Sequence, residues 1–271
     1  MVVRGEETKR VYLDEIAILL IENPAVAMTG CLLQALVEKK VRVIFCDEKY
    51  SPFAELAPYR TAYDSSRKIR MQISWDKDIK GAVWNEIVAE KIRNQAAFLR
   101  ELEKEREAEL LSSYVGQIEE YDATNREGHA AKVYFNALFG MDFSRTADIA
   151  ANAALNYGYG LLLSAFNREI AVSGYLTQMG LFHTNVFNPY NFSCDLMEPY
   201  RVLVDRFVLA NMPTVFEKDE KHALLSILNQ EVKIANATQT VLNSIKIYCR
   251  SVFEALNEGD MSKISFYQRK I

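Results

Sequence analysis

The chain has 271 residues and only three histidines, His129, His183 and His222, so a reaction that depends on histidine has few candidates. His183 is the most suggestive of them. The glycine-containing apolar segment GYLTQMGLFH ends at this residue, and the polar, turn-prone segment TNVFNPYNFS follows it. A histidine beside a loop is well placed to face a cleft and act there as an acid, a base or a metal ligand. Taken alone, a structural or exposed histidine is the commoner explanation.

Two carboxylates follow in the segment CDLMEPYR, where Asp195 and Glu198 are three residues apart. On a helix they would share one face, and two carboxylates side by side can bind a cation. The alternative is structural. Asp195 would then lie in the first turn of a helix, where the helix dipole favours a negative charge, and Pro199 would fix an early or kinked position.

A third acidic residue, Glu127, opens the segment NREGHAAKVYFNALFG, whose apolar residues outline one face of a helix. Thr124 and Glu127 also fit the T-x-x-E capping box, in which the glutamate folds back onto the amide of the N-cap residue. Both interpretations put Glu127 at a helix N-terminus, so its position does not choose between a ligand and a cap.

The positions of the prolines divide the chain into an early part and a later part in which these residues lie. Pro24, Pro52 and Pro58 fall early, and none follows until Pro189, which allows long helices in between. The early part holds short β-rich runs, RVYLDE, IAILLIE and VRVIFCD, separated by a turn-like ENPA and a short helical CLLQALVEKK. Later, apolar and buried-type residues recur every three or four positions, at Val83, Ile87, Val88, Ile92, Gln95 and Leu99.

These patterns predict an α+β protein: a small N-terminal sheet domain over residues 1–60, and a larger all-α domain over residues 61–271 that carries the site. Composition agrees, because 49% hydrophobic and 25% charged residues are typical of a globular chain. The uncharged stretch from Ile149 to Phe166 is interrupted by Asn and Gly, which favours a buried helix over a membrane span.

The N-terminus becomes charged too early for a signal peptide, and the four cysteines are scattered without a CxxC pair. We therefore expect a cytoplasmic protein with reduced thiols and no membrane association. The sequence also contains no P-loop, GxGxxG, GxSxG or HExxH motif, which argues against the common nucleotide-dependent and hydrolase classes.

The net charge of −4 gives no general attraction for nucleic acid, so any DNA binding must come from a local patch. The best basic cluster lies at the domain junction, and two further arginines follow the DLMEP segment. The candidate phosphate contacts are Arg60, Arg67, Lys68, Arg70, Arg201 and Arg206. Each of them could instead be the partner of a surface salt bridge.

Three segments together resemble the CRISPR-associated integrase family, the universal first protein of the spacer-adaptation module. They are NREGHAAKVYFNALFG, LNYGYGLLLSAFNREIAVSGYLTQMGLFH and FNPYNFSCDLMEPYRVLVDR, in the family's order and spacing. The DLMEP segment is similar to the corresponding segment of type II systems. The resemblance extends over nearly the whole chain, from LDEIAILLIEN onward.

The resemblance implies an N-terminal β-sandwich, a C-terminal helical domain, and catalytic metal ligands at Glu127, His183 and Glu198 for Mg²⁺ or Mn²⁺. Asp195 matches a further acidic position and would be an outer-shell or alternative ligand. Many relatives have Asp where this chain has Glu198. The chain also begins inside what the resemblance marks as early strand sequence, so we expect a sandwich without its first strands and with an exposed edge.

The implied reaction is a transesterification in which the 3′-hydroxyl of a spacer DNA end attacks the CRISPR repeat, together with DNA endonuclease activity. The implied partners are a second copy of the chain, as a homodimer, and the small ferredoxin-like second CRISPR-associated protein. A hydrolytic metal-dependent nuclease and a non-catalytic scaffold that binds DNA ends remain as alternatives. Without a metal ion, one of the paired carboxylates should show a raised pKa.

Overall fold

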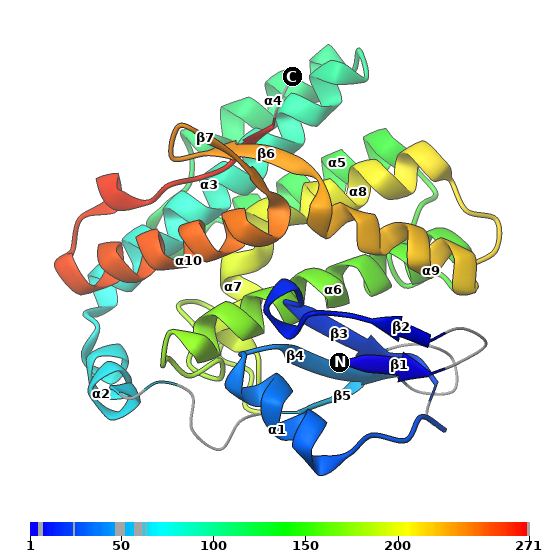
Figure 1. Ribbon diagram of the computed structural model, residues 1–271. Coiled ribbons are helices and arrows are strands. Elements are labelled where there is room, and N and C mark those ends of the chain that lie inside the picture. The colour runs from blue at the N-terminus through cyan, green and yellow to red at the C-terminus, as the bar shows by residue number, and fades with distance from the viewer. Residues whose placement is uncertain (5–7, 24, 47–51, 57–61, 63, 270–271) are drawn as a thin grey trace. The chain divides into compact units, whose positions relative to one another are not determined.

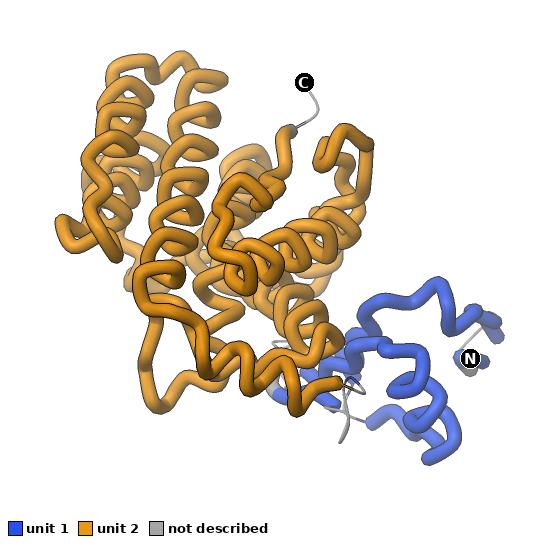
Figure 2. Tube along the Cα trace, turned by 90° about the vertical axis from the view of Figure 1, so that its left-hand side faces the viewer, with its two compact units in different colours: residues 1–63 blue, residues 64–271 orange. Residues whose placement is uncertain are grey.

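The computed structural model describes residues 1–4, 8–23, 25–46, 52–56, 62 and 64–269. The chain divides into two compact units, Met1–Tyr63 and Asp64–Ile271 (Figure 2). The predicted α+β class is confirmed, since small sheets come first in the chain and a mostly helical unit follows (Figure 1).

The first unit contains two small sheets in the part that the structure describes. Strands β1 (Val2–Arg4) and β2 (Thr8–Arg10) form an antiparallel pair. In the second sheet, β3 (Ile18–Ile21) runs parallel to β4 (Arg42–Cys46), which pairs antiparallel with β5 (Pro52–Leu56). A parallel pair needs a crossover connection, and helix α1 (Gly30–Glu38) provides it.

The core of this unit forms between α1 and the three-stranded sheet, around Leu36, Val41 and Val43, which are almost fully buried. One predicted strand is wrong in part. The RVYLDE run begins at the end of β2 and continues into a 3₁₀ turn, η1 (Leu13–Glu15), whose Leu13 packs against the core.

The second unit is built from long helices, as the absence of proline predicted. Its described helices are α2 (Ser65–Ser74), α3 (Lys77–Glu101), α4 (Glu105–Val115), α5 (Arg126–Phe139), α6 (Ala150–Val172), α7 (Asn191–Met197), α8 (Arg201–Asn211), α9 (Lys218–Leu225) and α10 (Val241–Glu258). Short 3₁₀ turns connect several of them: η2 (Glu120–Asp122), η3 (Glu198–Tyr200), η4 (Ser226–Asn229) and η5 (Met261–Lys263).

Two of these helices confirm the periodicity directly. In α3, the residues Val83, Ile87, Val88, Ile92, Gln95 and Leu99 are all buried. The uncharged stretch from Ile149 lies in α6, most of whose residues are buried. Within the described residues, no helix combines the length and the apolar composition that crossing a bilayer requires.

The prediction of an all-α second domain is wrong, because the unit contains a three-stranded sheet in the order β7-β6-β8. Strands β6 (Glu231–Ile234) and β7 (Ala237–Thr240) form a hairpin, and β8 (Gln268–Arg269) pairs with the other edge of β6. Ala235 and Asn236 take positive φ angles of 48° and 62° in the two-residue turn, as a type I′ hairpin requires. The alternation of exposed and buried residues in β6 was the signal for this strand.

Candidate active site

Glu127 lies at the start of α5, but it does not cap the helix. Asn125 is the N-cap residue, and its side chain accepts a hydrogen bond from the backbone N–H of Gly128 at 3.2 Å. The carboxylate of Asp122 accepts from the N–H groups of Arg126 and Glu127 at 2.7 and 2.9 Å. The capping box of Thr124 and Glu127 is therefore wrong. The four orphan N–H groups of the helix find other acceptors, which leaves the Glu127 carboxylate available.

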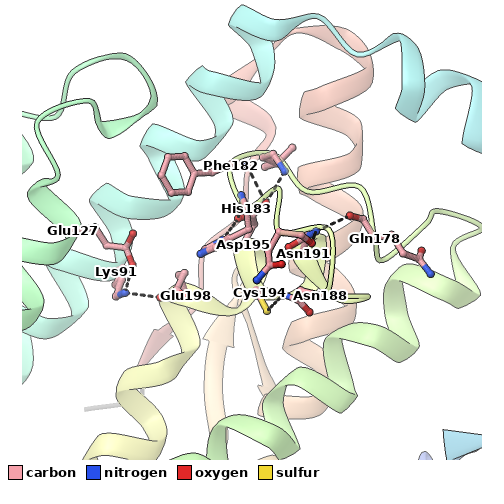
Figure 3. Close-up of polar contacts among 12 residues, drawn as sticks. Lys91, Glu127, Gln178, Phe182, His183, Asn188, Asn191, Cys194, Asp195 and Glu198 are labelled. Carbon is pink, nitrogen blue, oxygen red and sulfur yellow. Dashed lines mark hydrogen bonds and ion pairs between the residues drawn. The ribbon is translucent and has the colours of Figure 1, made fainter. Parts of the chain in front are cut away.

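That carboxylate turns toward α3 and contacts Lys91. The Nζ atom of Lys91 donates to Oε1 of Glu127 at 2.6 Å and to Oε2 of Glu198 at 2.5 Å (Figure 3). The two carboxylate oxygens are consequently no farther apart than the sum of these two distances. Side chains from α3, α5 and η3, which are distant in sequence, meet at one buried ammonium group.

Glu198 is 3% exposed, and both of its oxygens bind a cation. Oε1 accepts from Nε of Arg201 at 2.9 Å, and Oε2 accepts from Lys91. Burial alone would raise the pKa of Glu198, but Arg201 and Lys91 outweigh that effect and lower it to about 2. The expectation of a raised carboxylate pKa is wrong at Glu198, because two protein cations already neutralise the carboxylate.

Lys91 responds in the complementary way. Burial would lower the pKa of its ammonium, but the attraction of Glu198 and Glu127 outweighs burial and raises the pKa above its ordinary value. The group therefore stays charged, and the three side chains form an ionic cluster in which Lys91 and Glu198 are buried and Glu127 is partly exposed.

His183 lies in the loop between α6 and α7 and is held by Asp195. The Nδ1 atom of His183 is 2.5 Å from Oδ1 of Asp195, a carboxylate that is completely buried. Asp195 also accepts from the backbone N–H groups of Leu181, Phe182 and His183, at 2.5, 3.1 and 3.2 Å. One carboxylate thus orients both the imidazole and the loop that carries it, and it leaves Nε2 as the ring nitrogen that could bind a ligand.

Asp195 is the fifth residue of α7, so its predicted place in the first helical turn is wrong. The hydrogen bond to Asp195 raises the pKa of His183 against the opposing effect of burial, and burial raises the pKa of Asp195. Both shifts favour a proton held between Nδ1 and Oδ1.

Aromatic packing fixes the same loop against α3. Trp84, which is fully buried, stacks on Phe182 with ring centroids 4.7 Å apart and meets the edge of His183 at 5.8 Å. Gly180 permits the close approach, because a Cβ atom there would lie 2.4 Å from the carbonyl oxygen of His183 and 2.7 Å from Oδ2 of Asp195. His183 also lines a cavity of about 680 Å³ that the segment from Gln178 to Asn191 surrounds.

The structure assembles the predicted site only in part. It brings Glu127 and Glu198 to one cation and holds His183 and Asp195 as a neighbouring pair (Figure 3). Within the described residues, no three His, Cys, Asp or Glu side chains are grouped closely enough to hold a metal ion, so the convergence of Glu127, His183 and Glu198 on one ion stays a prediction. The donor chemistry nevertheless fits a divalent ion, since two carboxylates already enclose a cation and an oriented imidazole lies nearby.

Arg201 also contacts a buried hydrogen-bonded network formed by Tyr159, Asp205 and Tyr134. Its guanidinium lies 4.7 Å from the ring centroid of Tyr159, whose hydroxyl donates to Asp205. The hydroxyl of Tyr134 donates to the same carboxylate at 3.0 Å. Burial raises the pKa of Asp205 to about 6, although both tyrosine hydroxyls oppose the shift.

The candidate DNA-binding residues fall into two groups. On α2, Arg67 and Arg70 are exposed, and Lys68 forms an ion pair with Asp64 at 3.4 Å. Arg60 lies outside the described residues. Near the site, Arg201 is engaged by Glu198. Arg206 pairs with Glu101 and lies 4.0 Å from the ring centroid of Phe98.

Sequence reasoning missed Lys91 and Trp84. Lys91 interrupts the apolar positions of α3, four residues after Ile87 and four before Gln95, both of which are buried. A lysine on the buried stripe of a helix requires a negative partner, and that requirement was the available signal. Its partners come from other elements, so the sequence alone could not identify them.

Comparison with known proteins places this fold. A CRISPR-associated endonuclease Cas1 from Neisseria meningitidis serogroup C (strain 8013) is 35% identical over 209 residues, which cover 77% of this chain and 69% of that protein. A structure described as a casposase bound to integration product has a TM-score of 0.77 at 17% identity, covering 94% of this chain and 83% of the other. A structure described as a Cas6-RT-Cas1–Cas2 complex has a TM-score of 0.74 at 18% identity, covering 97% of this chain and 33% of that one.

In this chain a unit with small sheets precedes a helical unit. In the helical unit, two carboxylates bind one ammonium group beside a histidine that a buried aspartate orients. The family model described as CRISPR associated protein Cas1 matches residues 1–233. The chain belongs to the Cas1 family.

Proposed function

We propose that this protein is a metal-dependent DNA integrase of CRISPR adaptation that joins the 3′-hydroxyl ends of a spacer DNA to the repeat, with DNA endonuclease activity at the same site. One observation carries the proposal: Glu127 and Glu198 enclose a buried cation close to a histidine whose orientation a buried aspartate fixes. Family membership and the fold shared with a casposase bound to integration product support it.

Glu127, Glu198 and Nε2 of His183 would hold Mg²⁺ or Mn²⁺, both of which accept carboxylate oxygens. When bound, the ion would polarise the phosphodiester and lower the pKa of the attacking 3′-hydroxyl. The chain supplies positioning. Asp195 orients the imidazole of His183 through Nδ1, and Arg201 orients Glu198 by donating to its Oε1 atom.

Exchange of one phosphodiester for another needs no external energy source, which agrees with the absence of a P-loop in the sequence. The exposed arginines of α2 would contact phosphates away from the reacting bond. We further propose that the protein acts as a homodimer together with a small ferredoxin-like second CRISPR-associated protein. The Cas6-RT-Cas1–Cas2 complex of similar fold supports such an assembly.

A joining assay tests the proposal. DNA with pre-processed 3′-hydroxyl ends is supplied with a supercoiled repeat plasmid, Mn²⁺ and the partner protein, and joined products are separated from cleaved ones. We expect joining by the native chain and loss of at least about 100-fold for Glu127→Gln and His183→Gln. His129→Gln, an exposed change on the same helix as Glu127, is the matched control and should retain joining.

Two outcomes would contradict the proposal. Cleavage without joining would identify a hydrolytic nuclease, in which water replaces the 3′-hydroxyl. DNA-end binding that is independent of Mn²⁺ and of Glu127, without joining or cleavage, would identify a scaffold.

A further inference from the structure

Lys91 occupies the space between the two carboxylates that the proposed function assigns to the metal ion. The lysine comes from α3, whereas Glu127 comes from α5 and Glu198 from η3. Its ammonium lies 2.6 Å from one carboxylate oxygen and 2.5 Å from the other, and its side chain is 9% exposed. A buried ammonium is stable only with negative partners, and here both partners are proposed metal ligands.

The ammonium lies between the two carboxylate oxygens that face each other, where an ion bound by both carboxylates would lie. Mg²⁺ binds carboxylate oxygens at about 2.0–2.1 Å, so an ion held by Glu127 Oε1 and Glu198 Oε2 must lie against both atoms. A lysine ammonium has three donors and no lone pair, so Lys91 cannot join the ion's coordination shell. At its present position it excludes an ion from the space between these two oxygens.

Charge balance leads to the same conclusion. Arg201 binds the other oxygen of Glu198, so two carboxylates face two protein cations in the present arrangement. A divalent ion added to this cluster would set four positive charges against two negative ones. The withdrawal of one protein cation would reduce that excess.

Lys91 is the cation that can withdraw. Its ammonium is carried on a flexible four-carbon stem. The guanidinium of Arg201 is planar, makes two contacts to Glu198 Oε1, each at 2.9 Å, and stacks against Tyr159.

We propose that Lys91 is an internal counter-cation that holds Glu127 and Glu198 together in the metal-free site, and that a divalent ion must displace it to bind. The identity of the ion's ligands rests on the proposed function. Lys91 is thus a positioning residue that weakens metal affinity and holds the two carboxylates together.

Mn²⁺ binding to the full chain without DNA tests this role, measured by the electron paramagnetic resonance signal of free Mn²⁺ and by calorimetry. Lys91→Met should bind Mn²⁺ at least about tenfold more tightly than the native chain, because it removes a positive charge close to the site. The tighter binding should disappear when Glu198→Gln is added. Lys80→Met, which removes one charge elsewhere on α3, should change affinity by less than about twofold. Equal or weaker binding by Lys91→Met would overturn the proposal.

A second measurement on the native chain covers the case in which Lys91→Met does not fold. The ¹⁵Nζ resonance of the Lys91 ammonium is followed by NMR during a Mg²⁺ titration, with Lys91→Arg used for assignment. We expect the resonance to shift to that of a solvated ammonium as Mg²⁺ saturates the protein. An unchanged resonance at saturation would also overturn the proposal.

These readouts separate the two proposals, since neither needs DNA. If Mn²⁺ displaces Lys91 but the joining assay gives no product, the integrase function fails and the role of Lys91 stands. If joining depends on Glu127 but Lys91 stays in place at saturating Mg²⁺, the integrase function stands and the proposed role of Lys91 fails.

Discussion

At the scale of single residues, the Asp195 carboxylate makes four hydrogen bonds to one loop. It orients His183 through Nδ1 and accepts three backbone N–H groups of the same loop. Asp195→Asn replaces one acceptor oxygen by a donor and removes the charge. We expect joining to fall about 10- to 100-fold and stability to fall by about 1–3 kcal/mol.

Initial joining rates and urea unfolding measure the two effects. Asp219→Asn, on α9, provides a control with the same change of charge. If joining by Asp195→Asn equals that of the native chain, Asp195 has no part in positioning His183.

Asp205 gives a prediction about pH. Burial raises the pKa of its carboxyl from 3.8 to about 6, so the folded state binds this proton more tightly than the unfolded chain does. The stabilising contribution is therefore full below pH 3.8 and is lost as the pH rises through 6. Asp205→Asn keeps a neutral hydrogen-bonding partner for Tyr134 and Tyr159 and should remove this dependence.

Urea unfolding of both proteins between pH 4 and 7 measures the difference. We expect the native chain to lose about 1–3 kcal/mol more than Asp205→Asn over this range. Parallel curves for the two proteins would show that the Asp205 carboxyl does not titrate there.

At the scale of elements, α6 and α8 approach closely at Gly158. A Cβ atom at this position would lie 2.4 Å from Cγ1 of Val204, whereas nothing lies within 4 Å of the equivalent point at Gly160. Gly158→Ala should therefore destabilise the fold by about 1–3 kcal/mol through overpacking. Gly160→Ala, two residues along the same helix, should stabilise it by about 0.5–1 kcal/mol.

Thermal and urea unfolding of the two variants provide the comparison. The critical result is that the two variants change the free energy of unfolding in opposite directions, because both substitutions bring the same gain in helix propensity. Stabilisation by Gly158→Ala would contradict the packing of α6 against α8.

Helices were the most predictable elements, and the reason is periodicity. The buried stripe of α3 and the uncharged run of α6 each repeat over several turns, so local pattern and burial agree. The β6–β7 hairpin was missed because its strands are short and its type I′ turn contains Ala and Asn rather than Asn-Gly.

The site was less predictable than the fold. Glu127, His183 and Glu198 could be selected from the sequence through the family resemblance, whereas the hydrogen bond between Asp195 and His183 was not predicted. The Lys91 ammonium between Glu127 and Glu198 could not be, since it depends on how α3, α5 and η3 pack.

At the scale of the whole molecule, a net charge of −4 makes DNA binding depend on local basic surface. The exposed Arg67 and Arg70 lie three residues apart on α2, so they are neighbours on its surface. With about four phosphate contacts in total, log affinity for duplex DNA should fall with log salt at a slope of roughly −3 to −4. Arg67→Ala should reduce that slope by about one and weaken all sequences alike.

Fluorescence anisotropy with labelled duplexes between low and moderate salt measures the slope. Lys246→Ala, on α10, is a control for the loss of one positive charge. A slope near zero, or an Arg67→Ala effect confined to one sequence, would contradict the assignment of α2.

The central claim is that Glu127, Glu198 and His183 hold one divalent ion. Anomalous scattering from a crystal of the full chain soaked in Mn²⁺ tests it most directly. We predict one strong peak about 2.0–2.3 Å from a carboxylate oxygen of Glu127, from one of Glu198 and from Nε2 of His183, with the Lys91 ammonium moved away. A Mn²⁺ peak elsewhere, with Lys91 still bound to both carboxylates, would contradict the account.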